Sequence, residues 1–389
     1  MGKKSGWALC RVTLLVMARR KGASCLLAAV AALGVFASIA LYNLTARQEA
    51  AMADMVENTQ IRCVVTDVQG VSSSNLQMFS AYVDMLTGLR HERGCYLDQY
   101  VRNVRAKADS LVVEPEGITL RRILSFDSDS ALDPVEGAEV HLFQGWTEAD
   151  FRGQGQICLI PAGMATGTGQ QVDIQVREGI GLSLQVVGTV SGGPENVIWC
   201  PFYMPTQAGI SEAFRVESCS FDIGDNARLD QCKAEIYQVF ADPGQGQLGD
   251  GLTYGVVVQD ETYTASMEEF QANLAMLRLL LPVLTVLCGG IGFFGGYLAT
   301  RGRLTEFAVM RCLGMKRQRV FGLVFGEQLL LAVLGTVLGG TAGCLLEGAL
   351  AAGAMGRAGL VLAAFLAGGA VAAVRVTRVN LMKLLKAAE

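Results

Sequence analysis

The charged residues between positions 301 and 331 are the part of the sequence whose types and spacing most clearly predict an interaction. Residues 301–319 hold six basic side chains and one carboxylate, Glu306, and glycine-rich apolar runs lie on both sides. The apolar residues of this segment recur at helical spacing, and Gly314 follows them where a glycine ends a helix. Membrane anchoring by positive charge alone would require neither the carboxylate nor the ordered apolar face. We therefore predict a short helix that serves as a handle on which another protein can push.

Glu327 is an ionisable residue inside the apolar run that follows this segment. A charge at that depth is costly unless it is paired. We expect Glu327 to pair with Arg311 or Arg319, and the alternative is a side chain that reaches back to the membrane surface. Glu306 is expected to pair with Arg303 or Arg311.

Glycines at four-residue spacing occur in the same apolar runs. This spacing lines one helix face with small residues and lets a neighbouring backbone approach closely, although glycine is also frequent in membrane helices generally. The predicted helix-packing residues are Gly292, Gly296, Gly335, Gly339 and Gly343.

The sequence offers no pattern for catalysis, for a metal or for a nucleotide. It contains only two histidines, no GxSxG nucleophile elbow, and no phosphate loop of the type GxxxxGK followed by Ser or Thr. We predict a non-catalytic chain with no cofactor of its own. The basic residues lie at the edges of apolar runs, which argues against nucleic-acid binding. Six cysteines in residues 47–272 are expected to be buried free thiols or disulfides: Cys63, Cys95, Cys158, Cys200, Cys219 and Cys232.

Four apolar segments are long enough to cross a membrane, which requires about 20 residues. They are residues 23–46, 273–300, 320–346 and 358–375. For the last, which is short and rich in alanine, an interfacial helix is the alternative, and for the first the alternative is a cleaved signal peptide. Residues 1–22 have the pattern of an amphipathic leader that lies on the membrane surface.

Charge indicates how these spans are oriented. Residues 47–272 carry 32 acidic and 14 basic side chains, whereas basic residues predominate in residues 1–22, 301–319 and 376–389. The positive-inside rule places these three basic segments in the cytoplasm. We therefore predict a multi-pass protein of the plasma (inner) membrane with both termini inside, residues 47–272 outside, and a short external loop at residues 347–357.

The predicted outer domain is mixed α/β. Alternating apolar runs predict strands, and longer periodic runs predict helices at residues 75–89 and 227–240 and from about residue 262 into the second span. The predicted strands are residues 61–68, 117–124, 156–160, 172–176, 182–190, 197–200, 218–222 and 254–259. The short strands and glycine turns of about residues 125–215 indicate an inserted β subdomain. The predicted fold class is therefore four transmembrane helices with a large extracytoplasmic α/β domain between the first and second.

The sequence resembles the FtsX-like permease family of ABC transporters, in particular its MacB-type four-span layout. Residues 303–314, RLTEFAVMRCLG, are similar to the family's cytoplasmic segment, and GEQLLLAVLGTVLGG is similar to its third span. The resemblance implies a permease subunit that forms a homodimer or pairs with a paralogue, lies in membrane lipid, and docks on a separate P-loop ABC ATPase that binds ATP and magnesium. The coupling residues that it implies are Arg303, Glu306, Phe307, Met310, Arg311, Gly314 and Met315.

The resemblance also implies mechanotransmission, in which the spans relay ATP-driven motion of the partner to the outer domain. We expect a role in export or handling of a peptide, a lipid-like compound or a lipoprotein. One alternative is a non-transporting regulator of a cell-wall hydrolase. Another is a membrane-anchored receptor without an ATPase partner, although a receptor has no need of Glu306 and Gly314 in a basic cytoplasmic helix.

Overall fold

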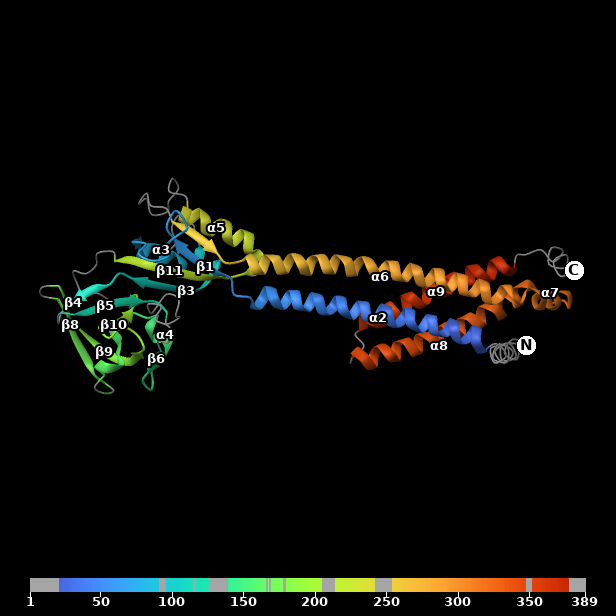
Figure 1. Ribbon diagram of the computed structural model, residues 1–389, viewed down its shortest axis with the longest axis horizontal. Helices are drawn as coiled ribbons and strands as arrows, with labels where there is room; N and C mark the ends of the chain where they lie inside the picture. The colour runs from blue at the N-terminus through green and yellow to red at the C-terminus, as the bar shows by residue number, and fades with distance from the viewer. Residues whose placement is uncertain are drawn as a thin grey trace. The chain divides into compact units, whose positions relative to one another are not determined.

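The computed structural model describes residues 21–90, 96–114, 117–125, 139–165, 167, 169–177, 180–204, 214–241, 254–347 and 352–377. The chain divides into two compact units (Figure 1). The membrane unit comprises residues 1–53 and 266–389, and the outer unit comprises residues 54–265. The leader predicted for residues 1–22 lies almost entirely outside the described residues.

Four long helices and one short helix dominate the chain outside the sheet. They are α2 (Lys21–Asn58), α6 (Glu261–Arg301), α7 (Leu304–Cys312), α8 (Arg317–Glu347) and α9 (Ala352–Thr377). All but α7 are long and apolar enough to cross a membrane. Helix α2 continues well past residue 46, and α9 begins before residue 358, so both helices are longer than the predicted spans. Helix α6 starts at the predicted place and continues through Pro282 as one helix.

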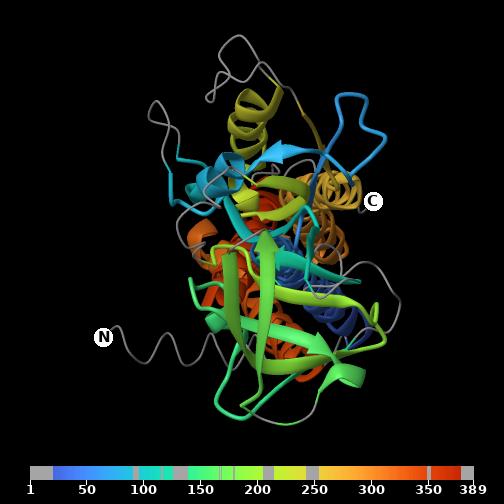
Figure 2. The same ribbon diagram turned by 90° about the vertical axis from the view of Figure 1, so that its left-hand side faces the viewer.

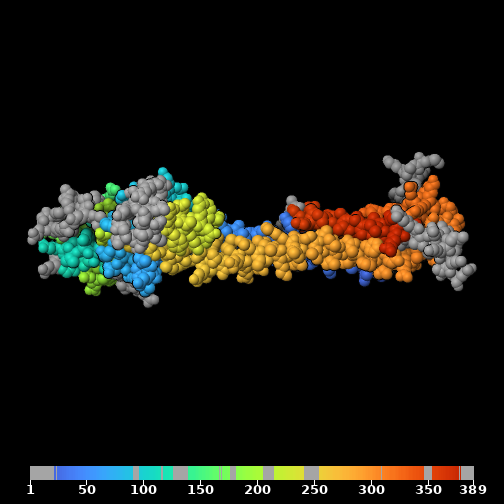
Figure 3. All heavy atoms as spheres, turned by 90° about the horizontal axis from the view of Figure 1, so that it is seen from above, coloured from blue at the N-terminus to red at the C-terminus, as the bar shows by residue number. Residues whose placement is uncertain are grey.

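Glycines bring the helices of the membrane unit close together. A Cβ atom at Gly339 would lie 2.2 Å from the carbonyl oxygen of Ala32 on α2, and one at Gly292 would lie 2.3 Å from that of Phe365 on α9. Gly335 and Gly343 also face α2, and Gly296 faces Gln328 of α8. Figure 3 shows α9 in red alongside α6 in orange. The five predicted glycines thus lie at close approaches to several neighbouring helices.

The outer unit is built on a twelve-stranded sheet with the order β12-β1-β11-β3-β5-β10-β7-β9-β6, in which β2 pairs with β11, β4 with β5 and β8 with β9. Its strands are β1 (Arg62–Thr66), β2 (Met78–Phe79), β3 (Val101–Ala108), β4 (Leu111–Val113), β5 (Ile118–Ile123), β6 (Glu139–Leu142), β7 (Ile157–Pro161), β8 (Gln171–Arg177), β9 (Ile180–Ser191), β10 (Val197–Pro201), β11 (Arg215–Ile223) and β12 (Gly255–Val258). Together with the membrane helices on either side of it in the sequence, this unit confirms the predicted fold class.

Helices α3 (Ser80–Leu86) and α5 (Leu229–Ala241) pack on the part of the sheet that contains β1, β11 and β12. The ring of Tyr82 on α3 stacks on Phe240 of α5 with 5.4 Å between centroids, and Phe240 stacks on Phe221 of β11 at 6.3 Å. The predicted helix 75–89 is shorter here because Asn75 and Gln77 have positive φ values that a helix does not allow.

A group of the other strands closes into a small barrel, which faces the viewer in Figure 2. Strands β4, β5, β10, β7, β9 and β8 pair in that order, and the bridge between Glu114 and Gln175 links β4 back to β8. Cys158 and Cys200 lie in the barrel core with Ile160 and Ile198. The cysteines of the described residues are free thiols. Because β4 and β5 are part of the barrel, the β subdomain begins before residue 125.

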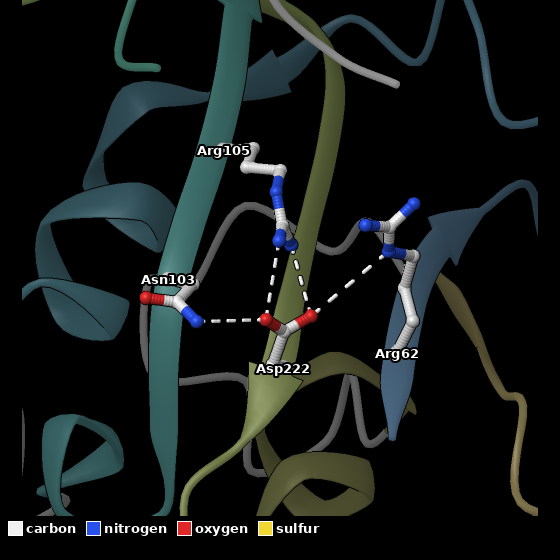
Figure 4. A network of polar contacts seen from close by, with 4 residues as sticks. All are labelled: Arg62, Asn103, Arg105 and Asp222. Atoms are coloured by element: carbon white, nitrogen blue, oxygen red, sulfur yellow. Dashed lines mark hydrogen bonds and ion pairs between the residues drawn. The ribbon is translucent and has the colours of Figure 1, made fainter. Parts of the chain in front are cut away.

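Strand β3, which carries three basic side chains, was not predicted from the sequence. The structure shows how two of them are neutralised: Arg105 donates to both carboxylate oxygens of Asp222 at 2.9 and 3.1 Å, and Lys107 lies 3.6 Å from Glu217. Figure 4 shows Asn103 and Arg62 completing the group around Asp222. Asn103, at φ 52° in an irregular part of the β3–β11 pairing, donates to Asp222 at 2.9 Å.

Burial alone would raise the pKa of Asp222. The hydrogen bonds from Arg105 and Asn103, together with the positive charges of Arg105 and Arg62, outweigh burial and hold this pKa below its ordinary value. The group is a structural support of the sheet, because Asp222 and Arg105 are both almost fully buried.

Candidate functional site

The predicted handle is the helix α7, which follows α6 after a two-residue turn. Arg303 is the residue at its N-cap, and its backbone N–H donates to the carbonyl oxygen of Thr300 at 3.0 Å. The first turn of α7 carries Glu306 and the last carries Arg311, so both charges are favourably placed with respect to the helix dipole.

The side chain of Arg303 joins α7 to α8. Its Nε donates to Glu306 Oε2 at 2.9 Å, and its Nη1 donates to Glu327 Oε2 at 2.7 Å. The guanidinium carbon also lies 5.2 Å from the ring centroid of Phe307. The arginine side chain is only 4% exposed, so these two carboxylates compensate a charge that is otherwise shielded from solvent.

The partner of Glu327 differs from the sequence prediction. Arg311 and Arg319 were expected, but the structure pairs Glu327 with Arg303, which is separated from it by α7 and the first turns of α8. Arg311 and Arg319 were expected because they are cations close to Glu327 in the sequence, whereas here the turn after α6 brings Arg303 to Glu327. For Glu306, the structure selects Arg303 from the two expected partners.

Gly314 ends α7 as predicted. Its φ is 88°, its N–H donates to the carbonyl oxygen of Arg311, and the N–H of Met315 donates to that of Met310. These two hydrogen bonds form the Schellman arrangement, which needs a residue in the left-handed region at this position. A Cβ atom at Gly314 would touch nothing, so backbone conformation rather than space requires a glycine.

An apolar cluster fixes the inner face of α7. Phe307 is buried against Val320 and Val324 of α8 and Ala373 of α9. Met310 and Met315 are partly buried at the edge of this cluster. Of the predicted coupling residues, Arg303 and Phe307 therefore face the interior, where they hold the helix rather than present a surface.

The remaining surface of α7 and of the turn after it is open. Glu306 is half exposed, Arg311 is partly exposed, and the apolar side chains of Val309 and Leu313 are exposed at 59% and 82%. Sequence reasoning did not single out Val309 and Leu313. Their exposure beside charged groups is the pattern of a protein-binding surface with apolar anchors and a polar rim. We call Glu306, Val309, Arg311 and Leu313 the α7 surface.

No cluster of metal-ligating side chains occurs within the described residues. The buried cysteines of the outer unit are also poorly suited to nucleophilic chemistry, because burial raises the pKa of the Cys200 and Cys219 thiols to about 12.

A comparison with models of known protein families finds a match over α7 and the helices that it contacts. Residues 279–381, which include α7, α8 and α9, match the model of the FtsX-like permease C-terminal family. The chain carries an FtsX-like permease C-terminal domain. This match confirms the resemblance to the FtsX-like permease family that was stated from the sequence.

One solved structure is similar to part of the chain. The periplasmic region of MacB from Actinobacillus actinomycetemcomitans is similar with 14% sequence identity and a TM-score of 0.32, covering 55% of this chain and 94% of that one. None of the curated proteins matches this chain. Members of the FtsX-like family are generally non-catalytic membrane subunits.

Proposed function

We propose that this FtsX-like permease docks a separate ABC ATPase on the α7 surface and relays its ATP-driven motion to the outer unit. In this proposal the chain binds no nucleotide, and ATP and magnesium are bound by the partner. The observation that carries the proposal is the attachment of α7, a helix held by buried contacts on one side and open on the other.

The attachment supports transmission of force. A push on α7 reaches α8 through the pairs of Arg303 with Glu306 and Glu327 and through the packing of Phe307. Buried ion pairs and packed side chains have few alternative arrangements, so a displaced helix carries its neighbour with it. An anchor held by charge on lipid alone would not need this connection.

Helix α6 supplies the route to the outer unit. It begins at Glu261, separated from the end of β12 by two residues, and ends at Arg301, two residues before the N-cap of α7. An unbroken helix transmits displacement along its axis because each turn is hydrogen-bonded to the next. A motion of α7 can therefore be delivered to the strand that precedes α6.

The proposed orientation follows from charge. Arg311 belongs to the α7 surface and Lys316 and Arg319 follow α7 in the sequence, whereas residues 47–272 are strongly acidic. The positive-inside rule puts α7 in the cytoplasm, where an ATPase is available, and the outer unit on the opposite side of the plasma membrane. A homodimer or a pair with a paralogue is part of the proposal, since an ABC ATPase works as a pair of nucleotide domains.

The cargo class that we propose is a peptide, a lipid-like compound or a lipoprotein. The cell-wall regulator is the second candidate, and the barrel counts against it because a regulator would need only a smaller outer domain. A receptor without an ATPase is the third candidate. It is disfavoured because no protein would then bind the α7 surface.

Co-purification tests the docking proposal. Full-length protein is extracted from native membranes, and the co-purified P-loop ATPase is identified by its peptides in mass spectrometry and by ATP hydrolysis. We expect Arg311→Glu and Leu313→Asp to lose this ATPase by at least tenfold. Arg357→Glu is the matched control, since Arg357 is partly exposed like Arg311 and lies near the start of α9, at the opposite end of that helix from Ala373, which packs on Phe307. Equal retention by all three variants would show that α7 is not the docking site.

A further inference from the structure

A small polar cavity lies inside the membrane unit, beside the Arg303–Glu327 ion pair that attaches α7 to α8. Its volume is about 30 Å³, and its walls come from α2, α6 and α8 together with Arg303. The polar side chains in its wall are Ser24, Thr300, Arg303, Glu327 and Gln328. The rest of its wall is aliphatic.

Three polar atoms in this wall are buried and have no hydrogen-bond partner within the part of the chain that the structure describes. They are Nη2 of Arg303 and both amide atoms of Gln328, Nε2 and Oε1. Arg303 is 3% exposed and Gln328 is 5% exposed, so bulk solvent does not reach them. Buried polar groups are nearly always hydrogen-bonded to protein or to ordered water.

The position of Gln328 is closely shaped by two glycines. A Cβ atom at Gly296 of α6 would lie 2.4 Å from Gln328 Nε2, and one at Gly369 of α9 would lie 2.3 Å from Gln328 Oε1. The amide therefore occupies a slot that only glycine leaves open on both sides. Thr300 Oγ1 already donates to the carbonyl oxygen of Gly296 at 2.7 Å, so in this cavity it is an acceptor.

We propose that the cavity is a binding site for ordered water, which bridges Arg303 Nη2 and the Gln328 amide. The water accepts hydrogen bonds from Arg303 Nη2 and Gln328 Nε2 and donates to Gln328 Oε1 and Thr300 Oγ1. A water molecule needs roughly 10–15 Å³ of such space and two to four polar partners, and this cavity offers room for about two molecules. Ligand pockets are typically at least about 300 Å³, which excludes a lipid headgroup or a cargo molecule here.

A second cavity in the same unit provides the contrast. It measures about 160 Å³ and is lined almost entirely by apolar side chains, including Val361 and Phe365. Apolar cavities stay free of water even when they are large enough to hold it. Water is therefore expected in the smaller cavity and not in the larger one.

The water site gives Arg303, which attaches α7 to α8, hydrogen bonds that can re-form when α7 moves. Hydrogen bonds to water exchange at small cost, whereas direct bonds between helices must break before a helix moves. Gln328 then acts as a positioning residue that keeps Arg303 solvated internally while α7 shifts. This consequence rests on the proposed function, but the water site itself rests only on the cavity and its unpaired atoms.

Radiolytic footprinting of the full-length protein in H₂¹⁸O tests the proposal. X-ray pulses generate hydroxyl radicals from bound water, which label the side chains beside it. We expect ¹⁸O on Leu331, which lines the polar cavity, at least fivefold above Val361, although both are almost fully buried. Equal labelling of Leu331 and Val361 would overturn the proposal.

Two variants exclude labelling by leakage from bulk solvent. Gln328→Met removes the amide partners at nearly constant length, and we expect it to abolish labelling of Leu331. Gln318→Met makes the same chemical change at an exposed position of α8 and is expected to leave the labelling unchanged. Undiminished labelling in Gln328→Met would also overturn the proposal.

Thermal unfolding gives an independent readout. In a dry cavity, Gln328→Met removes two unsatisfied polar atoms and raises the Tm. In a hydrated cavity, it strips Arg303 Nη2 of its water and lowers the Tm. No ATPase takes part in either experiment, so a failed docking test would leave this result standing.

Discussion

Arg303 is the residue on which the arrangement of α7 depends. It has one carboxylate from its own helix and one from α8, and it is almost completely shielded from solvent. A buried ion pair gains little over an apolar pair, but removing one partner leaves an uncompensated charge. The ion pairs of Arg303 therefore fix the position of α7 on α8 more than they increase the free energy of unfolding.

We expect removal of the Glu327 charge to lower the free energy of unfolding substantially. Breaking a buried pair costs about 3–5 kcal/mol, and we expect Glu327→Gln to lie near the lower end because its side chain keeps 16% exposure. Glu306→Gln is the control, since Glu306 pairs with the same arginine but is half exposed, where solvent screens the charge to below about 1 kcal/mol. Thermal unfolding of the two full-length variants in detergent measures their loss of stability. Equal losses would contradict a buried role for Glu327 and an exposed one for Glu306.

Asp222 allows a prediction about pH. Its folded-state pKa lies below the ordinary value of about 4. A depressed carboxyl pKa contributes stability that is present above the ordinary pKa and is lost as pH falls through the folded pKa. We expect Asp222→Asn to cost about 3 kcal/mol at pH 7, because it leaves Arg105 buried without its counter-ion.

The pH dependence of this stability difference shows whether Asp222→Asn acts through lost charge or through lost packing. The stability difference between the wild type and Asp222→Asn should shrink as the solution is acidified below about pH 4. Chemical denaturation at a series of pH values measures this difference. Asp225→Asn, at an exposed position beside Arg228, should show a much smaller difference throughout. A difference that stays constant with pH would indicate lost packing rather than lost charge.

Helices α2 and α8 are held together by small residues at their contact. Gly339 lies so close to the backbone of Ala32 that a methyl group would force the helices apart, whereas a Cβ atom at the adjacent Gly340 would touch nothing. Overpacking of this kind costs typically about 1–3 kcal/mol. We expect Gly339→Ala to lower the Tm and Gly340→Ala to leave it unchanged or slightly higher, since alanine favours a helix. The same shift for both variants would argue against the contact.

For the whole molecule, the proposed topology makes the two units accessible from opposite sides of the membrane. In a chain whose exposed cysteines are replaced by serine, Ser73→Cys in the outer unit should react with a membrane-impermeant maleimide on intact cells. Gln318→Cys, near the α7 surface, should react only after permeabilisation. Both positions are exposed, so burial does not explain a difference. Reaction of Gln318→Cys on intact cells would reverse the proposed orientation.

Local patterns in the sequence predicted much of this architecture. The four spans, most strands of the outer unit, the start of α6 and the glycine that ends α7 all depend on periodicity, length or a single backbone conformation. Those properties act between residues close in the chain, where one sequence is enough. The sequence also indicated that Glu327 needs a partner, because an unpaired charge in an apolar helix is too costly.

Only the tertiary structure decided which residues satisfy those needs. Arg303 is the partner of Glu327 because the turn after α6 folds α7 against α8, and Arg105 makes a strand of a basic segment because β11 brings Asp222 to it. The slot around Gln328 likewise exists only where two glycines of separate helices meet. Charges and polar groups distant in the chain are compensated through packing, and packing is a property of the whole fold rather than of any one segment.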